Sequence, residues 1–216
     1  TYGWVEFVRY SKPEAGLVSD RYHYKLGFLT GIVFSLNGVD VFFENLIAAD
    51  ADPVIIDLES MFHTPIDTGL DASPFASSQL RLHSSVTGIG VLPHPGRGAS
   101  ETEVFDVTVL GAAVNAQAPY NVSSIENFGR VDMKITETPG WIHETTSSSV
   151  DGALDSAHAN LVFDGLKSAF KCIRGQSARL SSPNGVVDQC FSGAERRLIV
   201  RDTKVYGSLQ SDESHP

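Results

Sequence analysis

Cysteine and basic residues are both scarce in this sequence. Cys172 and Cys190 are the two cysteines among 216 residues, and nothing in the sequence forces them into a bridge. We therefore expect a reducing compartment, the cytoplasm. Sixteen Lys and Arg stand against 26 Asp and Glu, a net charge of −10. Nucleic-acid binding needs basic stripes, so this balance argues against it, although a few local cations and a metal ion are enough to hold nucleotide phosphates.

Long apolar runs and paired metal ligands are missing as well. No apolar run reaches the length of a membrane span. None of the seven histidines has a metal-ligand spacing, so zinc is not indicated. There is no initiator methionine and the chain stops at "SDESHP". We interpret it as a piece of a longer protein, for which a missing signal peptide is uninformative.

What the sequence does contain suits one globular unit. Hydrophobic residues make up 42% of the chain, including 12 Phe. A chain of this length can bury about two-thirds to three-quarters of its unfolded surface, which is enough for one core.

The first periodic segment follows "LVSD" and predicts a helix with one buried face. Its apolar residues, at steps of four and three, are Tyr22, Leu26, Leu29, Val33 and Leu36. Ser19 is the predicted N-cap, and Asn37-Gly38 the predicted end. Gly27 and Gly31 weaken this helix or mark the close packing of another element.

The stretch "GVDVFFENLIAADADPVIIDLESMF" contains two short apolar runs around the turn "ADAD". We predict a strand pair from Leu46 to Ala48 and from Pro53 to Asp57. Pairing would bring Asn45 and Asp57 to the same end, across about 5 Å of strand spacing. The loop that carries Asp40 follows directly after the predicted buried helix, so we expect the helix to support it.

From Met61 to about Ser149 the chain is rich in Ser, Thr, Gly and Pro. We expect "GIGVLPHPGRGASE" to be a loop, "EVFDVTVLGAAV" a strand or buried segment, and "ETTSSSVDG" an exposed linker.

A second helical stripe and a final strand and helix follow. The stripe consists of Val162, Leu166, Ala169 and Ile173. "RRLIVRDTKVYGSL" predicts a strand from Arg197 to Arg201 and then a helix that starts near Asp202. Arg197, Ile199 and Arg201 would share one face of that strand.

Asp40, Asn45 and Asp57 follow one another at intervals of five and twelve residues. This order is typical of the large lobe of protein kinases. There, the first Asp orients or deprotonates the attacking hydroxyl, and the Asn and second Asp hold Mg²⁺ against the nucleotide phosphates. Both side chains offer the oxygen ligands that Mg²⁺ prefers. The alternative is an ordinary hairpin with surface acids and an Asn that caps a turn.

The residues around this pattern resemble the dehydratase domain of type 2 lanthipeptide synthetases. That family has D-x-H-x-E-N-L-I-A and then a hydrophobic run that ends in I-D-L-E; this chain has "DVFFENLIA" and "VIIDLE". Further similar segments occur in the family's order at Trp4–Tyr10, Ser84–Pro93, Phe163–Phe170 and Arg197–Pro216. They span nearly the whole chain, while the stretch from about Gly96 to Gly152 matches only loosely.

The resemblance implies an α+β fold like the large lobe of a protein or lipid kinase, rich in helix and with a small catalytic hairpin. It also implies an enzyme that phosphorylates Ser and Thr of a ribosomal precursor peptide with ATP and Mg²⁺. Phosphate elimination then gives dehydroalanine or dehydrobutyrine. On this basis Asp40 orients the hydroxyl, Asn45 and Asp57 bind magnesium, and Arg197 and Thr203 act in elimination. A fixed guanidinium would stabilise the departing phosphate.

Each of these residues also has a purely structural interpretation. Arg197 and Arg201 could form a solvated strand face, or pair with Glu195 or Asp202. Thr203 follows Asp202 at the predicted helix start, and its role could be limited to capping that helix.

Position 42 departs from the family pattern. Phe42 stands where the family has His, and general acid–base assistance is typically worth about 10²–10⁴ in rate. Asp40 could act alone, the protein could be a degenerate relative, or an aromatic ring could replace an orienting His by packing. Glu44 and Glu59 either act directly or hydrogen-bond to the residues that do.

A second departure concerns domain content. A kinase needs a small lobe whose Lys binds the phosphates, and no segment before Asp40 is long enough for one. We expect residues 1–216 to be a single, partial domain of a larger synthetase, without the small lobe or the cyclase domain. Its partners would be the precursor peptide and the remaining domains. Two alternatives stay open: a kinase-like phosphotransferase for another substrate, without elimination, and a degenerate, pseudokinase-like peptide-binding module.

Overall fold

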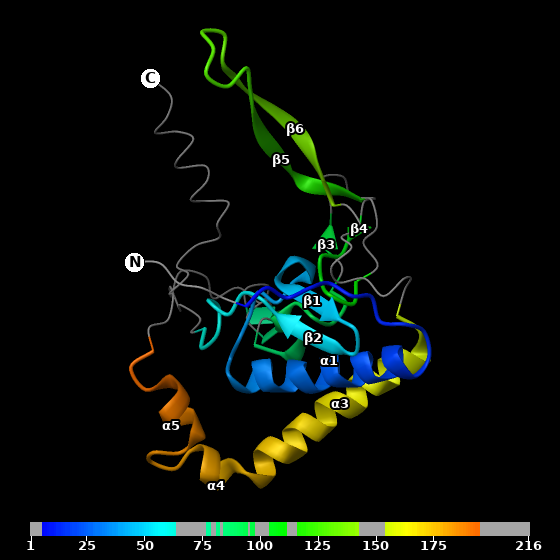
Figure 1. Cartoon of the computed structure of the whole chain (residues 1–216), viewed down its shortest axis with the longest axis vertical. Coiled ribbons are helices and arrows are strands. Elements are labelled where there is room, and N and C mark those ends of the chain that lie inside the picture. Colours follow the sequence, from blue (N-terminus) through cyan, green and yellow to red (C-terminus); the bar gives the residue numbers. More distant parts are fainter. Residues whose placement is uncertain are drawn as a thin grey trace.

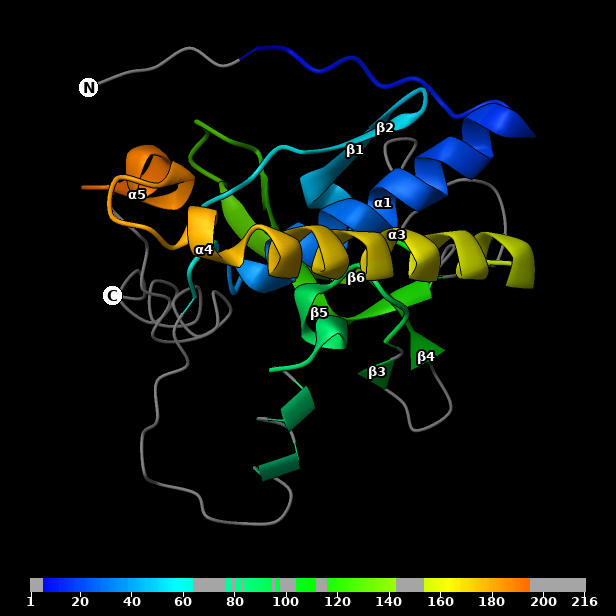
Figure 2. The same ribbon diagram turned by 90° about the horizontal axis from the view of Figure 1, so that it is seen from below.

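The computed structural model describes residues 6–63, 77–78, 81–82, 84–94, 96–97, 104–111, 116–142 and 154–194. Two long helices, α1 (Leu17–Ser35) and α3 (Ser156–Gly175), lie side by side (Figures 1 and 2). The short antiparallel pair β1–β2 lies next to α1, and a longer hairpin projects away from both helices (Figure 1). The architecture mixes helices and strands in the α+β manner; its likeness to a kinase lobe stays a prediction.

Helix α1 has the predicted buried face, since Tyr22, Leu26 and Val33 are buried. Its predicted cap is wrong. The helix begins at Leu17 after Gly16, which adopts φ 86°, and the Asp20 N–H already donates to the Gly16 carbonyl. Glycine tolerates this left-handed backbone, so the first turn forms earlier than the Ser19 signal suggests.

Glycines allow α1 and α3 to cross at backbone contact, which confirms the close-packing interpretation of Gly27. A Cβ on Gly27 would lie 1.9 Å from the Val162 carbonyl oxygen. A Cβ on Gly165 would lie 2.0 Å from the Tyr24 carbonyl oxygen. The predicted stripe on α3 faces this crossing, with Val162 and Ala169 buried.

Two stacked imidazoles join the N-terminal ends of these helices. The rings of His23 and His158 lie 4.1 Å apart, and the His23 Nδ1–H donates to the Ser19 carbonyl at 2.7 Å. His158 Nδ1 lies 3.0 Å from an oxygen of Asp155, the N-cap of α3, and its Nε2 lies 3.6 Å from Asp20. Burial lowers the pKa of the His23 imidazole, although the bond to Ser19 opposes this, and His158 adds to the lowering.

The predicted strand pair is present as β1 (Leu46–Ala49) and β2 (Asp52–Ile55). The strands are antiparallel, and Leu46 is the partner of Ile55. Leu46 and Ala48 point into the core, so one face of the hairpin is buried. Asp57 lies two residues beyond the end of β2.

Residues 84–94 and 104–111 pack on the other side of the core. The first contains the 3-10 turn η2 (Val86–Ile89) and the second the short strand β4 (Val104–Phe105), which pairs with β3 (Gly96–Arg97). The predicted alternatives for "EVFDVTVLGAAV" both apply, because a short strand precedes the buried Thr108 and Val109. The core residues come from α1, the β1–β2 hairpin and these two segments: Tyr22, Leu26, Val33, Val41, Leu46, Ala48, Met61, Ile89, Val91 and Val109.

A long hairpin occupies part of the region rich in Ser, Thr, Gly and Pro, at residues for which we made no specific prediction. It is formed by β5 (Ala116–Glu126) and β6 (Lys134–Ile142), with a register shift between Gln117 and Asn121. The turn uses positive φ at Asn127 (56°) and Gly129 (77°). The sequence does not indicate these strands because neither face of the outer hairpin is buried, so they lack an apolar–polar alternation.

Short helices α4 (Ser177–Leu180) and α5 (Val186–Phe191) follow α3. None of the helices in the described part of the chain is long and apolar enough to cross a membrane. The predicted linker "ETTSSSVDG", and the predicted strand and helix after Glu195, lie outside the described residues.

Candidate active site

The loop that carries Asp40 is held by backbone hydrogen bonds from segments far away in sequence. The Val41 N–H donates to the Ile89 carbonyl at 2.8 Å. Phe42 forms an antiparallel bridge with Thr108. On the other side, Ser60 Oγ–H donates to the Val39 carbonyl at 2.5 Å. The loop is therefore clamped between both halves of the core.

Within this loop Asp40 adopts a left-handed backbone, with φ 65°, and is half-buried. Asn45 ends the 3-10 turn η1 (Phe43–Asn45), and its side-chain Nδ2–H donates to the Asp40 carbonyl at 2.8 Å. This bond links the two predicted site residues. Because the amide nitrogen is used internally, Oδ1 of Asn45 is the atom left to accept from, or coordinate, a ligand.

Asp57 lies at the same end of the β1–β2 hairpin as Asn45. The Ile56 N–H donates to the Asn45 carbonyl at 3.0 Å, which extends the ladder by one step. Asp57 follows directly, and its Oδ1 accepts the N–H of Glu59 at 3.0 Å. The regular ladder does not extend past Asn45, the last residue of η1, so strand pleating no longer dictates the two side-chain directions. Their joint role in metal binding stays a prediction.

The remaining predicted residues divide into two groups. Glu44 and Glu59 are both exposed, beside Asn45 and Asp57 respectively. Arg197 and Thr203 lie outside the described residues, so their elimination role stays a prediction.

Gly90 is a structural partner of the loop that our assignment of site residues missed. It has φ 100°, and a Cβ there would lie 2.9 Å from the Val41 carbonyl oxygen and 3.0 Å from Cδ1 of Phe42. The Phe42 ring thus packs against a glycine backbone and is half-buried. A glycine between the apolar residues Ile89 and Val91 was the available signal for such a close approach.

Asp106 shapes the segment that pairs with Phe42. Its Oδ1 accepts from the backbone N–H and the hydroxyl of Thr108, at 2.9 and 2.6 Å. Its Oδ2 accepts the His94 N–H at 3.0 Å. Asp106 therefore ties both core segments to each other next to the Asp40 loop, a long-range contact that has no local sequence signal.

An apolar cavity of about 800 Å³ adjoins this end of the β1–β2 hairpin. Its walls include Val33 of α1, Ile55 of β2, Leu58 and Phe62 after the hairpin, and Phe191 of α5. Glu59 is the one charged residue in the described lining, which is otherwise apolar. The arrangement thus offers oxygen ligands at the hairpin end, with an apolar hollow beside them.

Comparisons with known proteins give a family and a partial relative. Residues 1–216 match the family described as "Domain of unknown function (DUF4135)". The chain is also 41% identical over 66 residues to a protein of Lactococcus lactis subsp. lactis named "Lacticin 481/lactococcin biosynthesis protein LcnDR2". The aligned segment covers 31% of this chain and 7% of that protein, so the chain corresponds to a small part of the relative.

Proposed function

This chain belongs to the DUF4135 family, and we propose that it carries the phosphotransfer and elimination residues of a lanthipeptide synthetase dehydratase. In this proposal the enzyme phosphorylates Ser and Thr of a precursor peptide with ATP and then eliminates the phosphate. The partial relative, which is named a lacticin 481/lactococcin biosynthesis protein, supports this class of substrate.

The observation that supports the proposal most directly is the linkage of the three predicted residues. Asn45 donates its amide to the Asp40 carbonyl, and the hairpin ladder brings Asp57 to the same end. The residues proposed as the hydroxyl-orienting carboxylate and the two oxygen ligands therefore belong to one short, clamped unit. Because an Asn that caps a turn would also bind the backbone carbonyl of Asp40, metal binding has to be tested directly.

The donor set fits Mg²⁺. Asn45 offers an amide oxygen, and Asp57 offers a carboxylate whose Oδ2 has no bond to the Glu59 N–H. Magnesium sites of nucleotide enzymes typically combine one or two such protein oxygens with substrate phosphates and water. When bound, the ion would neutralise charge on the phosphates of ATP.

The two chemical steps assign different work to this chain. In the first, the peptide hydroxyl oxygen attacks the γ-phosphorus, the bond to the β-phosphate oxygen breaks, and the Asp40 carboxylate accepts the hydroxyl proton. In the second, a base removes the α-proton, the Cβ–O bond breaks and phosphate departs. Arg197 and Thr203 would donate hydrogen bonds to the departing phosphate.

The test uses the full-length protein with its precursor peptide, ATP and Mg²⁺. We expect Asp57→Asn to lower the single-turnover phosphorylation rate at least about 100-fold, because a preorganised electrostatic contact at the transition state is worth about 10²–10³. Asp52→Asn, at the turn end of the same hairpin, is the matched control and should change the rate less than about threefold. EPR-detected binding of Mn²⁺ with ATP gives a readout besides activity. Full Mn²⁺–ATP binding and turnover in Asp57→Asn would refute the assignment.

One observation favours a second candidate, a catalytically degenerate peptide-binding module. The Phe42 ring packs against Gly90 and has no acid–base group. Such a module would bind the peptide. The wild-type protein would then show neither Mn²⁺–ATP binding nor a phosphorylated peptide intermediate. Nucleotide binding in the unmodified protein therefore separates the two candidates.

A further inference from the structure

Two described segments pair with each other and connect the ends of the proposed site. Residues 36–39 follow helix α1 and lead into Asp40, and residues 57–63 begin at Asp57. Their backbones are joined by hydrogen bonds from the Phe62 N–H to the Leu36 carbonyl (3.0 Å), from the His63 N–H to the Asn37 carbonyl (2.9 Å) and from the Val39 N–H to the Ser60 carbonyl (3.4 Å). The backbone before Asp40 is therefore tied to the segment that carries Asp57.

Ser60 binds Val39 through both its backbone and its side chain. Its carbonyl accepts the Val39 N–H, and its hydroxyl donates to the Val39 carbonyl. That carbonyl belongs to the planar peptide unit between Val39 and Asp40, so turning this unit would change the φ angle of Asp40. Ser60 is 4% exposed, so water competes little for the bond. Ser60 thus fixes the orientation of the backbone directly before the Asp40 side chain.

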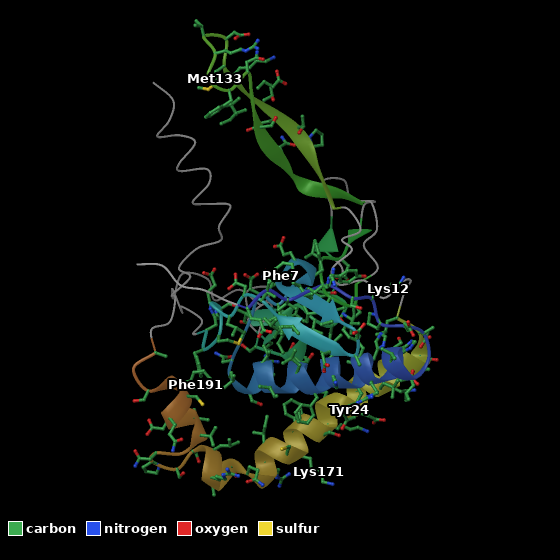
Figure 3. The ribbon with its side chains drawn as sticks, in the orientation of Figure 1. Phe7, Lys12, Tyr24, Met133, Lys171 and Phe191 are labelled. Carbon is green, nitrogen blue, oxygen red and sulfur yellow. The ribbon has the colours of Figure 1, made fainter. Side chains whose placement is uncertain are left out.

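Three left-handed backbone conformations lie in the same two segments. Asn37, Asp40 and Phe62 have φ angles of 51°, 65° and 57°. This region is unfavourable for residues with a side chain, least for Asn and Asp and most for bulky residues such as Phe. Such residues persist where the surrounding structure holds them, and they concentrate at functional sites. The Phe62 ring packs edge-on against Phe191 of α5, which Figure 3 labels, with ring centroids 4.7 Å apart.

The link from Ser60 back to Asp57 is a compact turn. Oδ1 of Asp57 accepts the Glu59 N–H at 3.0 Å. The Met61 N–H donates to the Leu58 carbonyl at 3.2 Å. These two overlapping bonds span the residues on both sides of Ser60, so its position is coupled to that of Asp57.

We propose that Ser60 is a positioning residue that sets the Asp40 carboxylate against the metal-binding end of the hairpin. The inference rests on the proposed function, and Ser60 acts in it only through the backbone of Val39. Without the hydroxyl, the peptide unit before Asp40 can turn and carry the carboxylate away from the attacking hydroxyl. Asn45 and Asp57 keep their places, because the β1–β2 ladder does not involve Ser60. The loss therefore falls on phosphate transfer and not on nucleotide binding.

Single-turnover phosphorylation by the full-length protein, with precursor peptide, ATP and Mg²⁺, tests this role. We expect Ser60→Ala to lower the rate about 10–100-fold, because a misplacement of about 1 Å can cost 10²-fold. Mn²⁺–ATP affinity, measured by EPR, should be unchanged. Ser60→Thr keeps the hydroxyl and should recover most of the rate. A Ser60→Thr variant as slow as Ser60→Ala would contradict the role of the hydroxyl.

Thr30→Val is the matched control. Thr30 is 1% exposed, and its hydroxyl donates to the Leu26 carbonyl at 2.7 Å within α1. Both Thr30→Val and Ser60→Ala remove one buried bond from a hydroxyl to a backbone carbonyl, so thermal melts should show similar losses of stability. Only Ser60→Ala should slow phosphorylation. Equal slowing by both variants would mean that general loss of stability, and not positioning, accounts for the effect.

A double-mutant cycle with Asp40 separates positioning from other effects. In an Asp40→Asn background, Ser60→Ala should lower the rate no further, because residues that act as a unit are strongly non-additive. A further loss as large as the one in the wild-type background would show that Ser60 does not act through Asp40 and would overturn the proposal.

Amide hydrogen exchange tests the contact without any activity. Ser60→Ala should speed exchange of the Val41 N–H, which lies in the same loop and donates to the Ile89 carbonyl, because the loop opens more easily. Unchanged exchange would sink the link between Ser60 and the loop, whatever the activity. Faster exchange in a wild-type protein background that never phosphorylates the peptide would instead reject the proposed function, and with it the kinetic role of Ser60.

Discussion

Two hairpins of the described chain, β1–β2 and β5–β6, are held in opposite ways. β1–β2 has four residues in each strand and one face in the core. β5–β6 has strands of 11 and nine residues, yet its outer part is exposed on both faces. The short hairpin is fixed by its surroundings, while the long one relies on its own ladder.

The difference shows where this molecule can support chemistry. Asp40, Asn45 and Asp57 are located where bonds from distant segments converge, as Val41 to Ile89 and Ser60 to Val39 illustrate. Preorganised groups need such support from the surrounding structure. The long hairpin has no such support within the described chain and presents exposed apolar side chains instead. Alanine substitutions can test this difference. Each pair compares a glycine where the new Cβ would meet other atoms with one where it would meet none, so the loss of stability reports packing and not backbone conformation.

The largest effect is expected at the crossing of α1 and α3. Gly27→Ala would place a Cβ 1.9 Å from a backbone oxygen of Val162, which no side-chain adjustment relieves. We expect it to lower the unfolding free energy by about 3 kcal/mol. Gly175→Ala is the control at the end of α3, where a Cβ meets nothing within 4 Å. It should be neutral or stabilising by up to about 1 kcal/mol.

Urea denaturation of both variants measures the difference. Equal stabilities of Gly27→Ala and Gly175→Ala would mean that the helices can separate at no cost. The contrast between the packed body and the projecting hairpin would then lose its basis.

The sequence predicts the packed region well and the projecting one poorly, for a common reason. Buried faces leave periodic patterns, so α1, α3 and the β1–β2 pair follow from residues such as Tyr22, Leu26 and Val162. Even the role of Gly27 at a close approach was predictable. Exposed strands leave no such pattern, and the sequence predicts no strand for residues 116–142.

Long-range contacts explain most of what the sequence does not predict about the site. Gly90 and Asp106 are about 50 and 66 residues from Asp40, and no local signal joins them. The order Asp40, Asn45, Asp57 was visible, and so was their shared hairpin end. The bond from Asn45 to the Asp40 carbonyl depends on the η1 turn, which has no apolar periodicity.

An intermediate effect is expected at Gly90, where conformation and contact can be separated. Gly90 and Gly129 both have positive φ, 100° and 77°, so alanine is strained at either position by about 1 kcal/mol. Only at Gly90 would the new Cβ also meet the Val41 carbonyl, at 2.9 Å. We expect Gly90→Ala to cost about 2–3 kcal/mol and Gly129→Ala about 1 kcal/mol.

The same pair of variants tests the site in the full-length protein. Gly90→Ala should also weaken Mn²⁺–ATP binding, because it displaces the backbone of Val41 beside Asp40, while Gly129→Ala should leave binding unchanged. If both variants lose equal stability and equal nucleotide affinity, the clamp on the Asp40 loop does not exist in solution.

The smallest effect is expected from pH, and it belongs to the packed body alone, since residues 116–142 contain no histidine. Burial lowers the pKa of His23 in the folded chain below the value of about 6.5 that it has when unfolded. Between those two values the unfolded chain binds more protons, so stability falls as the pH drops below about 6.5. Above that pH the imidazole is neutral in both states and the contribution is constant.

The groups that face His23 define the window in which this can be measured. The His158 ring packs against it, and the charges of Asp20 and of Asp155, the N-cap of α3, act on it as well. The backbone N–H of His158 lowers the pKa of the Asp155 carboxyl below its ordinary value, so the pH dependence between about pH 5 and 7 can be used to test His23. Thermal melts at pH 7.5 and 5.5 should show a lower Tm at pH 5.5, and a smaller difference in His23→Gln. His94→Gln, at an exposed position, should keep the wild-type difference; an unchanged difference in His23→Gln would assign the pH dependence to another group.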